Sequence, residues 1–185
     1  MSDLVSLLHQ FADLFDRLTV PYAVMGGWAV RLYALPRPTY DIDFTIVIER
    51  ERLPDLYEAA RDAGFSVPEQ FAAGWIDSVA GMPLVKFRLF VEGRSIDIDV
   101  FIAESDYQRA LMDRRQPHLV ASQEAWFVSP EDLVLLKLIA GRKRDLADIE
   151  DVLLGQPDVD EAYMRRWAGP LGIAEQLEQA LAERA

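Results

Sequence analysis

The sequence predicts an α+β fold: a mixed β-sheet of about four to five strands with flanking helices, and further helices at the C-terminal end. Three observations support this fold class. Apolar residues recur at helical spacing near the N-terminus, strict alternation marks residues 41–48 and 84–102, and the last third of the chain carries mainly helix signals. Strands and helices that are segregated in this way are typical of α+β domains.

Helix predictions rest on apolar spacing and on signals at helix ends. Leu and Phe recur three and four residues apart near the N-terminus, as in an amphipathic helix that packs on a core. At 129–132 the residues Ser-Pro-Glu-Asp combine an N-cap hydroxyl, a proline at the first helical position and acids in the first turn. The predicted helices are 3–18, 28–35, 51–63, 105–114, 129–141, 145–155, 161–167 and 171–184.

Strand predictions rest on the alternation of apolar and polar residues. The strand at 41–48 has one wholly apolar face, while its other face begins with carboxylates, and residues 94–102 repeat the pattern. Glu92-Gly93 predicts the turn of a hairpin between the last two long strands. The predicted strands are 20–25, 41–48, 84–91, 94–102 and 118–121, with a short one near Trp75 in the otherwise irregular stretch 66–82.

Length and composition are those of one globular domain with a helical appendage. The chain has 185 residues, of which 51% are hydrophobic and 27% charged. We expect residues 1–155 to form the main domain and residues 156–185 to pack on it. No apolar run reaches the ~18–20 residues of a membrane span, and the N-terminus has no signal-peptide pattern. We therefore expect a cytoplasmic protein without a membrane partner.

Charge and ligand counts narrow the classes of site. The formal net charge is −12, which argues against an extended nucleic-acid platform, because such a platform needs a basic surface. The sequence has no cysteine, and His9 and His118 are too few and too scattered for a zinc centre. Any metal should therefore be a hard cation bound by oxygen.

Asp41 and Asp43 lie two residues apart on a predicted strand and project to the same face. An exposed acidic strand edge is the plainer interpretation. The strand is apolar enough to be central, however, and like charges near a buried surface need a compensating cation. Mg²⁺ is the usual one, because it takes one or two carboxylates together with phosphate oxygens and water.

Asp99 is the preferred third carboxylate and Asp97 the alternative, since spacing alone does not choose between them. If their strand lies beside that of Asp41 and Asp43, three carboxylates converge on one face. Three carboxylates suffice to hold two metal ions ~3.5–4 Å apart, the arrangement for in-line nucleotidyl transfer. We therefore expect two Mg²⁺ ions, with Asp41, Asp43 and Asp99 as catalytic ligands.

Gly26-Gly27 stands between a strand and a helix, 13 residues before the acidic pair. The plainer interpretation is a connection that needs small residues. A glycine pair at the start of a helix also lets backbone N–H groups approach an anion. Together, the glycines and the acids predict a site that holds a phosphate and a metal side by side.

This pattern of hydrophobic-Gly-Gly, Asp-hydrophobic-Asp-hydrophobic and a later strand carboxylate resembles the DNA polymerase β superfamily of nucleotidyltransferases. The chain is most similar to small prokaryotic members, the minimal nucleotidyltransferases and the AbiEii-like toxin family. The segments RPTYDIDF (37–44) and PEDLVLLKLIAGRKRDLADIEDVL (130–153) match best, and the resemblance covers roughly residues 20–155.

The resemblance implies that residues 1–155 form a nucleotidyltransferase domain in which Gly26 and Gly27 contact the nucleotide phosphates. It also implies that the three aspartates hold Mg²⁺. Many relatives have Ser at the position of Gly27, so one hydroxyl contact to phosphate is missing here. Arg37, just before the acids, either steers the triphosphate or is a surface charge.

Lys137 lies in a helix that is apolar all round and therefore needs an anionic partner, either a core carboxylate or the nucleotide phosphate. Arg144 lies two turns further on the same face if the helix continues, so the two would form a cationic wall opposite the acids. Asp148 is predicted to pair with Arg144 at a spacing of four residues, although the resemblance leaves it a role in the active face. Trp28 either touches the base or ribose or packs in the core.

The preferred function is a Mg²⁺-dependent nucleotidyltransferase that moves an NMP from an NTP, ATP by default, to an acceptor hydroxyl. The acceptor is a small molecule, a protein or tRNA, and the resemblance adds the toxin of a toxin–antitoxin pair with a cognate antitoxin. The alternative is a non-catalytic module that keeps the fold for nucleotide sensing or protein interaction. The presence of all three acids favours the enzyme.

Overall fold

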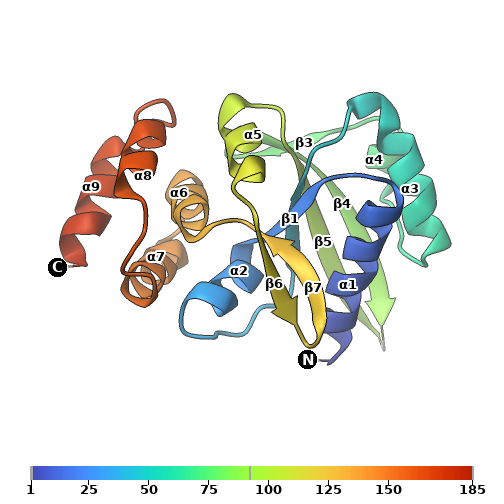
Figure 1. Ribbon diagram of the computed structural model, residues 1–185. Helices are drawn as coiled ribbons and strands as arrows, with labels where there is room; N and C mark the ends of the chain where they lie inside the picture. Colours follow the sequence, from blue (N-terminus) through green and yellow to red (C-terminus); the bar gives the residue numbers. More distant parts are fainter. Residues whose placement is uncertain (1, 92, 185) are drawn as a thin grey trace.

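A seven-stranded mixed sheet forms the centre of the computed structural model, which describes residues 2–91 and 93–184 (Figure 1). The strand order is β3-β4-β5-β2-β1-β7-β6. The strands are β1 (Tyr22–Met25), β2 (Ile42–Ile46), β3 (Asp77–Val79), β4 (Met82–Val91), β5 (Arg94–Ile102), β6 (Gln116–Val120) and β7 (Gln123–Phe127). The α+β class is confirmed.

The expected number of four to five strands is wrong, because short strands at both edges extend the sheet. β3 spans three residues and pairs antiparallel with β4. β7 has the sequence QEAWF, without a clear alternation, and becomes a strand by pairing with β6 and, through Val24 opposite Phe127, with β1. Such strands depend on partners that are distant or weakly patterned, so alternation does not reveal them.

The helices mostly begin and end where terminal signals place them. Ser129 accepts a hydrogen bond from the Asp132 backbone N–H, and Ser105 forms a full capping box with Gln108. The helix after the first strand begins at Gly26 itself rather than at residue 28. The helices are α1 (Ser2–Arg17), α2 (Gly26–Tyr33), α3 (Leu53–Asp62), α4 (Glu69–Ala72), α5 (Asp106–Asp113), α6 (Pro130–Ala140), α7 (Lys143–Gly155), α8 (Glu161–Ala168) and α9 (Ala174–Glu183), with a 3₁₀ turn at Arg50–Arg52.

The central strands bring distant acids into register. β2 runs antiparallel to β1 and parallel to β5, and Asp43 stands opposite Asp99. β4 and β5 form the predicted antiparallel hairpin, in which Lys86 stands opposite Asp99. Of the predicted turn, Gly93 has a positive φ of 76°, whereas Glu92 lies outside the described residues.

The two faces of the sheet differ because side chains alternate along a strand. On one face, Phe44 of β2 packs against Phe11 and Phe15 of α1, with ring centroids 5.8 and 5.2 Å apart. Asp43 directly precedes Phe44, and Asp99 directly precedes the buried Val100. Both carboxylates therefore project from the opposite face of the sheet. The predicted division of the second strand into an apolar and an acidic face is confirmed.

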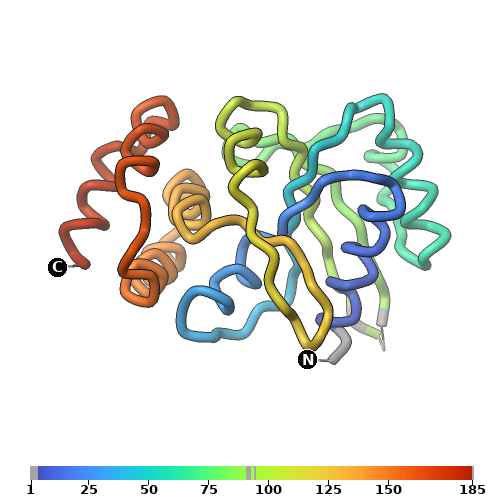
Figure 2. The backbone as a smooth tube through the Cα atoms, in the orientation of Figure 1, coloured from blue at the N-terminus to red at the C-terminus, as the bar shows by residue number. Residues whose placement is uncertain are grey.

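Helices from the second half of the chain cover the acidic face. α2 lies against α6 and α7, as the tube shows for the blue and orange segments (Figure 2). α8 and α9 pack on α6 and α7 at the end of the molecule that holds the C-terminus. Two hydrogen bonds tie α6 to the last helices, from the Asp160 N–H to Glu131 at 2.9 Å and from the Tyr163 hydroxyl to Asp132 at 2.7 Å. The division at residue 155 stays a prediction. No helix in the described parts of the chain is long and apolar enough to cross a membrane.

Candidate active site

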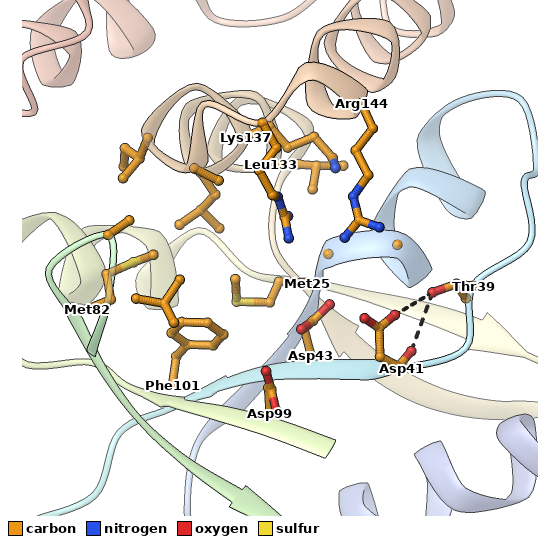
Figure 3. Close-up of a pocket in the computed structure, with 18 of the residues that line it drawn as sticks. Met25, Thr39, Asp41, Asp43, Met82, Asp99, Phe101, Leu133, Lys137 and Arg144 are labelled. Carbon is orange, nitrogen blue, oxygen red and sulfur yellow. Dashed lines mark hydrogen bonds between the residues drawn. The ribbon is translucent and has the colours of Figure 1, made fainter. Parts of the chain in front are cut away.

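A cavity of about 590 Å³ lies between the acidic face of the sheet and helix α6 (Figure 3). Asp41, Asp43 and Asp99 lie on the side formed by the sheet, and Lys137 and Arg144 approach from the helices. The start of α2 and the loop at 37–41 line one end. The cavity therefore gathers residues from the first strand to the seventh helix.

Asp41 and Asp43 lie close together on the wall of the cavity (Figure 3). The Thr39 hydroxyl donates a hydrogen bond of 2.9 Å to Asp41 Oδ1. Over residues 2–91 and 93–184, no Lys, Arg or His forms an ion pair with either carboxylate. Burial, and then the negative charges of Asp41 and Asp99, raise the pKa of Asp43 to about 7. Within those ranges, neither carboxylate is neutralised by an ion pair, although Arg142 and Lys137 act to lower the pKa of Asp43 from a greater distance.

Asp99 has a partner within the sheet. Lys86 donates to both of its carboxylate oxygens, at 2.9 and 2.8 Å. Asp97, two residues earlier, accepts from Arg88 at 2.6 and 3.0 Å and does not line the cavity. Of the two alternatives left open by the sequence, the structure brings Asp99 beside Asp43.

The residues present fit a hard cation at Asp41 and Asp43, because two carboxylates without a counter-charge are the usual protein contribution to a Mg²⁺ site that also binds phosphate. The three-carboxylate cluster expected for two ions is not assembled. In the described part of the chain, no three His, Cys, Asp or Glu residues are grouped to hold a metal ion. Asp99, the expected third ligand, instead forms an ion pair with Lys86.

The glycine pair allows close contacts behind the acids. A Cβ at Gly26 would lie 1.9 Å from Asp43 Oδ2, and one at Gly27 would lie 2.5 Å from Thr39 Oγ1. Gly26 also has a φ of 61°, which favours glycine. Among the residues that the structure describes, no side chain caps the start of α2, so its first N–H groups have no side-chain acceptor there, and Gly26 and Gly27 line the cavity.

Lys137 belongs to a set of charges that we call the α6–α7 charge network, formed by Arg37, Lys137, Arg142, Asp145 and Asp148. Lys137 is 4% exposed and donates to Asp148 at 2.5 Å and to Asp145 at 3.0 Å. Arg37 forms a two-pronged contact with Asp148 at 2.6 and 2.7 Å, and Arg142 Nε lies 2.7 Å from Asp145. The anionic partner of Lys137 is thus a pair of core carboxylates.

The predicted ion pair between Arg144 and Asp148 is wrong. The helix of Lys137 does not continue to Arg144, because α6 ends before Gly141, which has a φ of 62°. Arg144 and Asp148 do lie four residues apart in α7, but that spacing does not pair them. Arg37 and Lys137 take the Asp148 carboxylate instead. Arg144 lines the cavity, and its guanidinium points toward Asp41 (Figure 3).

Comparison with protein families assigns the chain to one family. The model of a family described as nucleotidyltransferases of unknown function (DUF6036) matches residues 2–167. The chain belongs to this family. Among curated proteins, none matches.

Several solved structures have the same fold. An antigenic nucleotidyltransferase-like protein from Paracoccidioides brasiliensis is 21% identical, with a TM-score of 0.57 over 98% of this chain and 93% of that one. The antibiotic-resistance factor ANT(2'')-Ia is 19% identical, with a TM-score of 0.58 over 98% and 96% of the two chains. Its complex with adenylyl-2''-tobramycin is 16% identical, with a TM-score of 0.57 over 91% and 97%. The nucleotidyltransferase part of the sequence-based resemblance is confirmed, and the AbiEii-like subtype stays a prediction.

Trp28 packs in the core. Its side chain is 6% exposed and does not line the cavity, and the Arg31 guanidinium lies 5.1 Å from its ring centroid. Of its two sequence-based alternatives, the structure supports core packing.

Three polar residues at the candidate site were not predicted from the sequence. Thr39 donates a hydrogen bond to Asp41, and Lys86 donates to Asp99. Asp145 accepts a hydrogen bond from Lys137. A signal for Lys86 was available. A hairpin with a two-residue turn at 92–93 pairs residues whose numbers add up to a constant, which places Lys86 opposite Asp99.

Proposed function

We propose that this nucleotidyltransferase moves a nucleoside monophosphate from a nucleoside triphosphate, ATP by default, to an acceptor hydroxyl in a Mg²⁺-dependent reaction. The carrying observation is the pair Asp41 and Asp43, which lies on the cavity wall without a counter-charge among the described residues, with Asp99 in register beside it. One structure with the same fold is a complex with an adenylyl-tobramycin, which supports ATP as the first nucleotide to test.

Each half of the reaction has residues suited to it. Asp41 and Asp43 would hold Mg²⁺, which supplies charge neutralisation for the triphosphate when bound. The N–H groups that follow Gly26 and Gly27 face the same space and suit the β- and γ-phosphates. Arg144 adds a positive charge from the opposite wall. Arg37 and Lys137 hold α6 and α7 through Asp148, so we assign them a positioning role.

Asp99 is suited to the acceptor. Its carboxylate takes the proton of the acceptor hydroxyl as the acceptor oxygen bonds to the α-phosphorus, and the bond from the α-phosphorus to the diphosphate oxygen breaks. Diphosphate then leaves with the electron pair of that bond. Lys86 donates to both oxygens of Asp99 and so holds the carboxylate in place.

Label transfer tests the proposal. The chain is incubated with each α-³²P-labelled NTP, Mg²⁺ and a cell extract that contains small molecules, tRNA and protein. The wild type and the double variant Asp41→Asn/Asp43→Asn are compared. We expect transfer by the wild type and a loss of at least ~100-fold in the double variant, because the phosphates lose their metal site.

Asp97→Asn is the matched control, since Asp97 lies on the strand of Asp99 but pairs with Arg88 outside the cavity. It should keep full transfer. If the wild type neither transfers label nor binds any NTP with Mg²⁺, the proposal fails. Mg²⁺-dependent NTP binding without transfer would favour the non-catalytic nucleotide sensor.

A further inference from the structure

The cavity has two halves of different chemistry, which meet at Asp43 and Asp99. Thr39, Asp41 and Arg144 lie at one end (Figure 3). At the other end Phe101 and Met82 lie on the side of Asp99 that faces away from Asp41 (Figure 3). We call Met82, Phe101 and Val79, which pairs with Met82 across β3 and β4, the apolar half of the cavity.

The apolar half is built partly from the core and partly from its rim. Phe101 is 6% exposed, so its position is fixed by packing. Val79 is 43% exposed at the rim. Removing the apolar surface of a cavity from water is favourable, so a ligand with an apolar body that covers this surface binds more tightly than one without it.

In-line geometry decides which substrate enters this half. The attacking and leaving oxygens lie on opposite sides of the α-phosphorus. The leaving diphosphate belongs at the end with the glycine pair and Arg144, where N–H groups and a positive charge meet. The acceptor must therefore approach from the other end, past Asp99, where the wall is apolar.

We propose that the apolar half is the acceptor subsite and that it takes an uncharged hydroxyl group carried on an aromatic or aliphatic body. The inference rests on the proposed function and names its acceptor class. Of the cavity-lining residues that the structure describes, Asp99 is the carboxylate at this half, and Lys86 already neutralises it. A polycationic acceptor therefore gains little from Asp99, whereas an apolar body covers Met82 and Phe101.

Methionine methyl groups report the site directly. Met25 and Met82 line the cavity, while Met112 and Met164 are buried in α5 and α8 and serve as internal references. The chain is labelled with [methyl-¹³C]methionine and saturated with Mg²⁺ and α,β-methylene-ATP, which is not cleaved at the α-phosphorus. The probes are 3-phenylpropan-1-ol for a free alcohol, N-acetyl-tyrosinamide for a tyrosine side chain, and kanamycin A for a polycation.

We expect at least one of the two apolar hydroxyl probes to shift the Met82 signal saturably, with Met112 and Met164 unchanged. Tighter binding of 3-phenylpropan-1-ol indicates a small-molecule acceptor, and tighter binding of N-acetyl-tyrosinamide indicates a tyrosine side chain. Val79→Glu should weaken that probe at least tenfold, because it places a charge at the apolar rim. Val47→Glu is the matched control, since Val47 is 38% exposed, lies outside the cavity and should change nothing.

Three results would overturn the inference: neither hydroxyl probe shifts Met82, kanamycin A shifts it more strongly than both, or the nucleotide analogue itself displaces the alcohol from Met82. The methyl-group measurements report binding and do not depend on catalytic turnover. Label transfer to a charged acceptor without binding of either hydroxyl probe sinks this inference and leaves the proposed function intact. Alcohol binding at Met82 without label transfer to any acceptor contradicts the proposed function instead.

Discussion

Lys86 holds Asp99 by both carboxylate oxygens, at 2.9 and 2.8 Å, and Asp99 stands opposite Asp43 on the neighbouring strand. One built-in cation thus lies next to two carboxylates that form no ion pair within the described residues. The arrangement follows from strand register, because β5 pairs with β4 on one side and with β2 on the other. It makes Lys86 a local competitor for any metal that approaches Asp99.

Lys86→Met should strengthen metal binding and slow turnover. Removing a positive charge beside three carboxylates makes the local potential more negative, so the affinity for Mn²⁺ should rise several-fold. Nucleotide transfer should fall at least ~10-fold, since Asp99 loses the contact that orients it. Mn²⁺ titration followed by electron paramagnetic resonance gives the affinity, and label transfer gives the rate.

Arg88→Met is the control for this prediction, because Arg88 pairs with Asp97 in the same hairpin and outside the cavity. It should leave both readouts unchanged. An unaltered or weaker Mn²⁺ affinity in Lys86→Met would show that Lys86 does not compete with the metal.

Asp43→Asn should stabilise the metal-free protein above neutral pH. Burial raises the pKa of Asp43 from 3.8 to about 7, so the folded protein loses stability as the pH rises through this range and Asp43 ionises. At about 1.36 kcal/mol per unit, the cost reaches at most about 4 kcal/mol. Urea unfolding should show a more stable variant at pH 8 and equal stability at pH 4.

Added Mg²⁺ should reduce the difference in stability between Asp43→Asn and the wild type at pH 8, because the ion stabilises the wild type alone. Asp97→Asn should behave in the opposite way, with a small loss of stability above the usual pKa of an aspartate, since the Arg88 contact lowers the pKa of Asp97 and the pair is exposed. A wild type as stable as Asp43→Asn at pH 8 without metal would contradict the idea that Asp43 lacks a counter-charge.

Lys137→Met should destabilise the fold by about 3–5 kcal/mol, the usual cost of removing one partner from a buried ion pair. Asp145 and Asp148 would remain buried with less positive charge around them. The double variant Lys137→Met/Asp148→Asn should recover part of the loss, because it also removes one of the two charges. Urea unfolding of both variants and the wild type gives the coupling; a loss below ~1 kcal/mol in the single variant would argue against it.

The same network should govern acid unfolding. Burial acts to raise the pKa of Asp148, but hydrogen bonds from Arg37 and Lys137 outweigh it and leave the pKa below its usual value. Asp145 behaves likewise through Arg142 and Lys137. Their contribution to stability is therefore complete above pH ~4 and is lost as the pH falls through their lowered pKa values.

In Lys137→Met these pKa values rise, so acid unfolding should begin at higher pH. Circular dichroism during an acid titration measures the midpoint. Arg50→Met removes a more exposed ion pair with Glu104 and provides the control, whose midpoint should barely move. Equal shifts in the two variants would mean that burial of the network has no special effect.

Gly26→Ala should abolish metal binding through a clash rather than through backbone strain alone. Its Cβ would lie 1.9 Å from Asp43 Oδ2, at a φ of 61°. Gly64→Ala is the matched control, because Gly64 also has a positive φ, 90°, but a Cβ there would meet nothing within 4 Å among the described residues. Both variants should lose about 1–2 kcal/mol of stability from the left-handed conformation; only Gly26→Ala should lose Mn²⁺ binding in the same resonance assay.

Much of the site was accessible from local pattern. Alternation placed Asp41 and Asp43 on the polar face of an apolar strand. The N-cap Ser129 and the first-turn residues after it predicted the start of α6. The preference for Asp99 over Asp97 followed from neither spacing nor alternation, because both acids share a face. Only the pairing of β2 with β5 brings Asp99 beside Asp43 and leaves Asp97 to Arg88.

The fold class, the glycine turn and the acidic pair could be inferred from sequence, since each depends on residues within one turn or one strand of one another. The width of the sheet, the partners of Lys137 and the capture of Asp99 by Lys86 emerged only when the chain was folded. Those outcomes depend on which distant segments meet: Asp148 lies 111 residues from Arg37 and 11 from Lys137, and it accepts hydrogen bonds from both. Local preference carries no information about such choices, because long-range packing and desolvation set their energies.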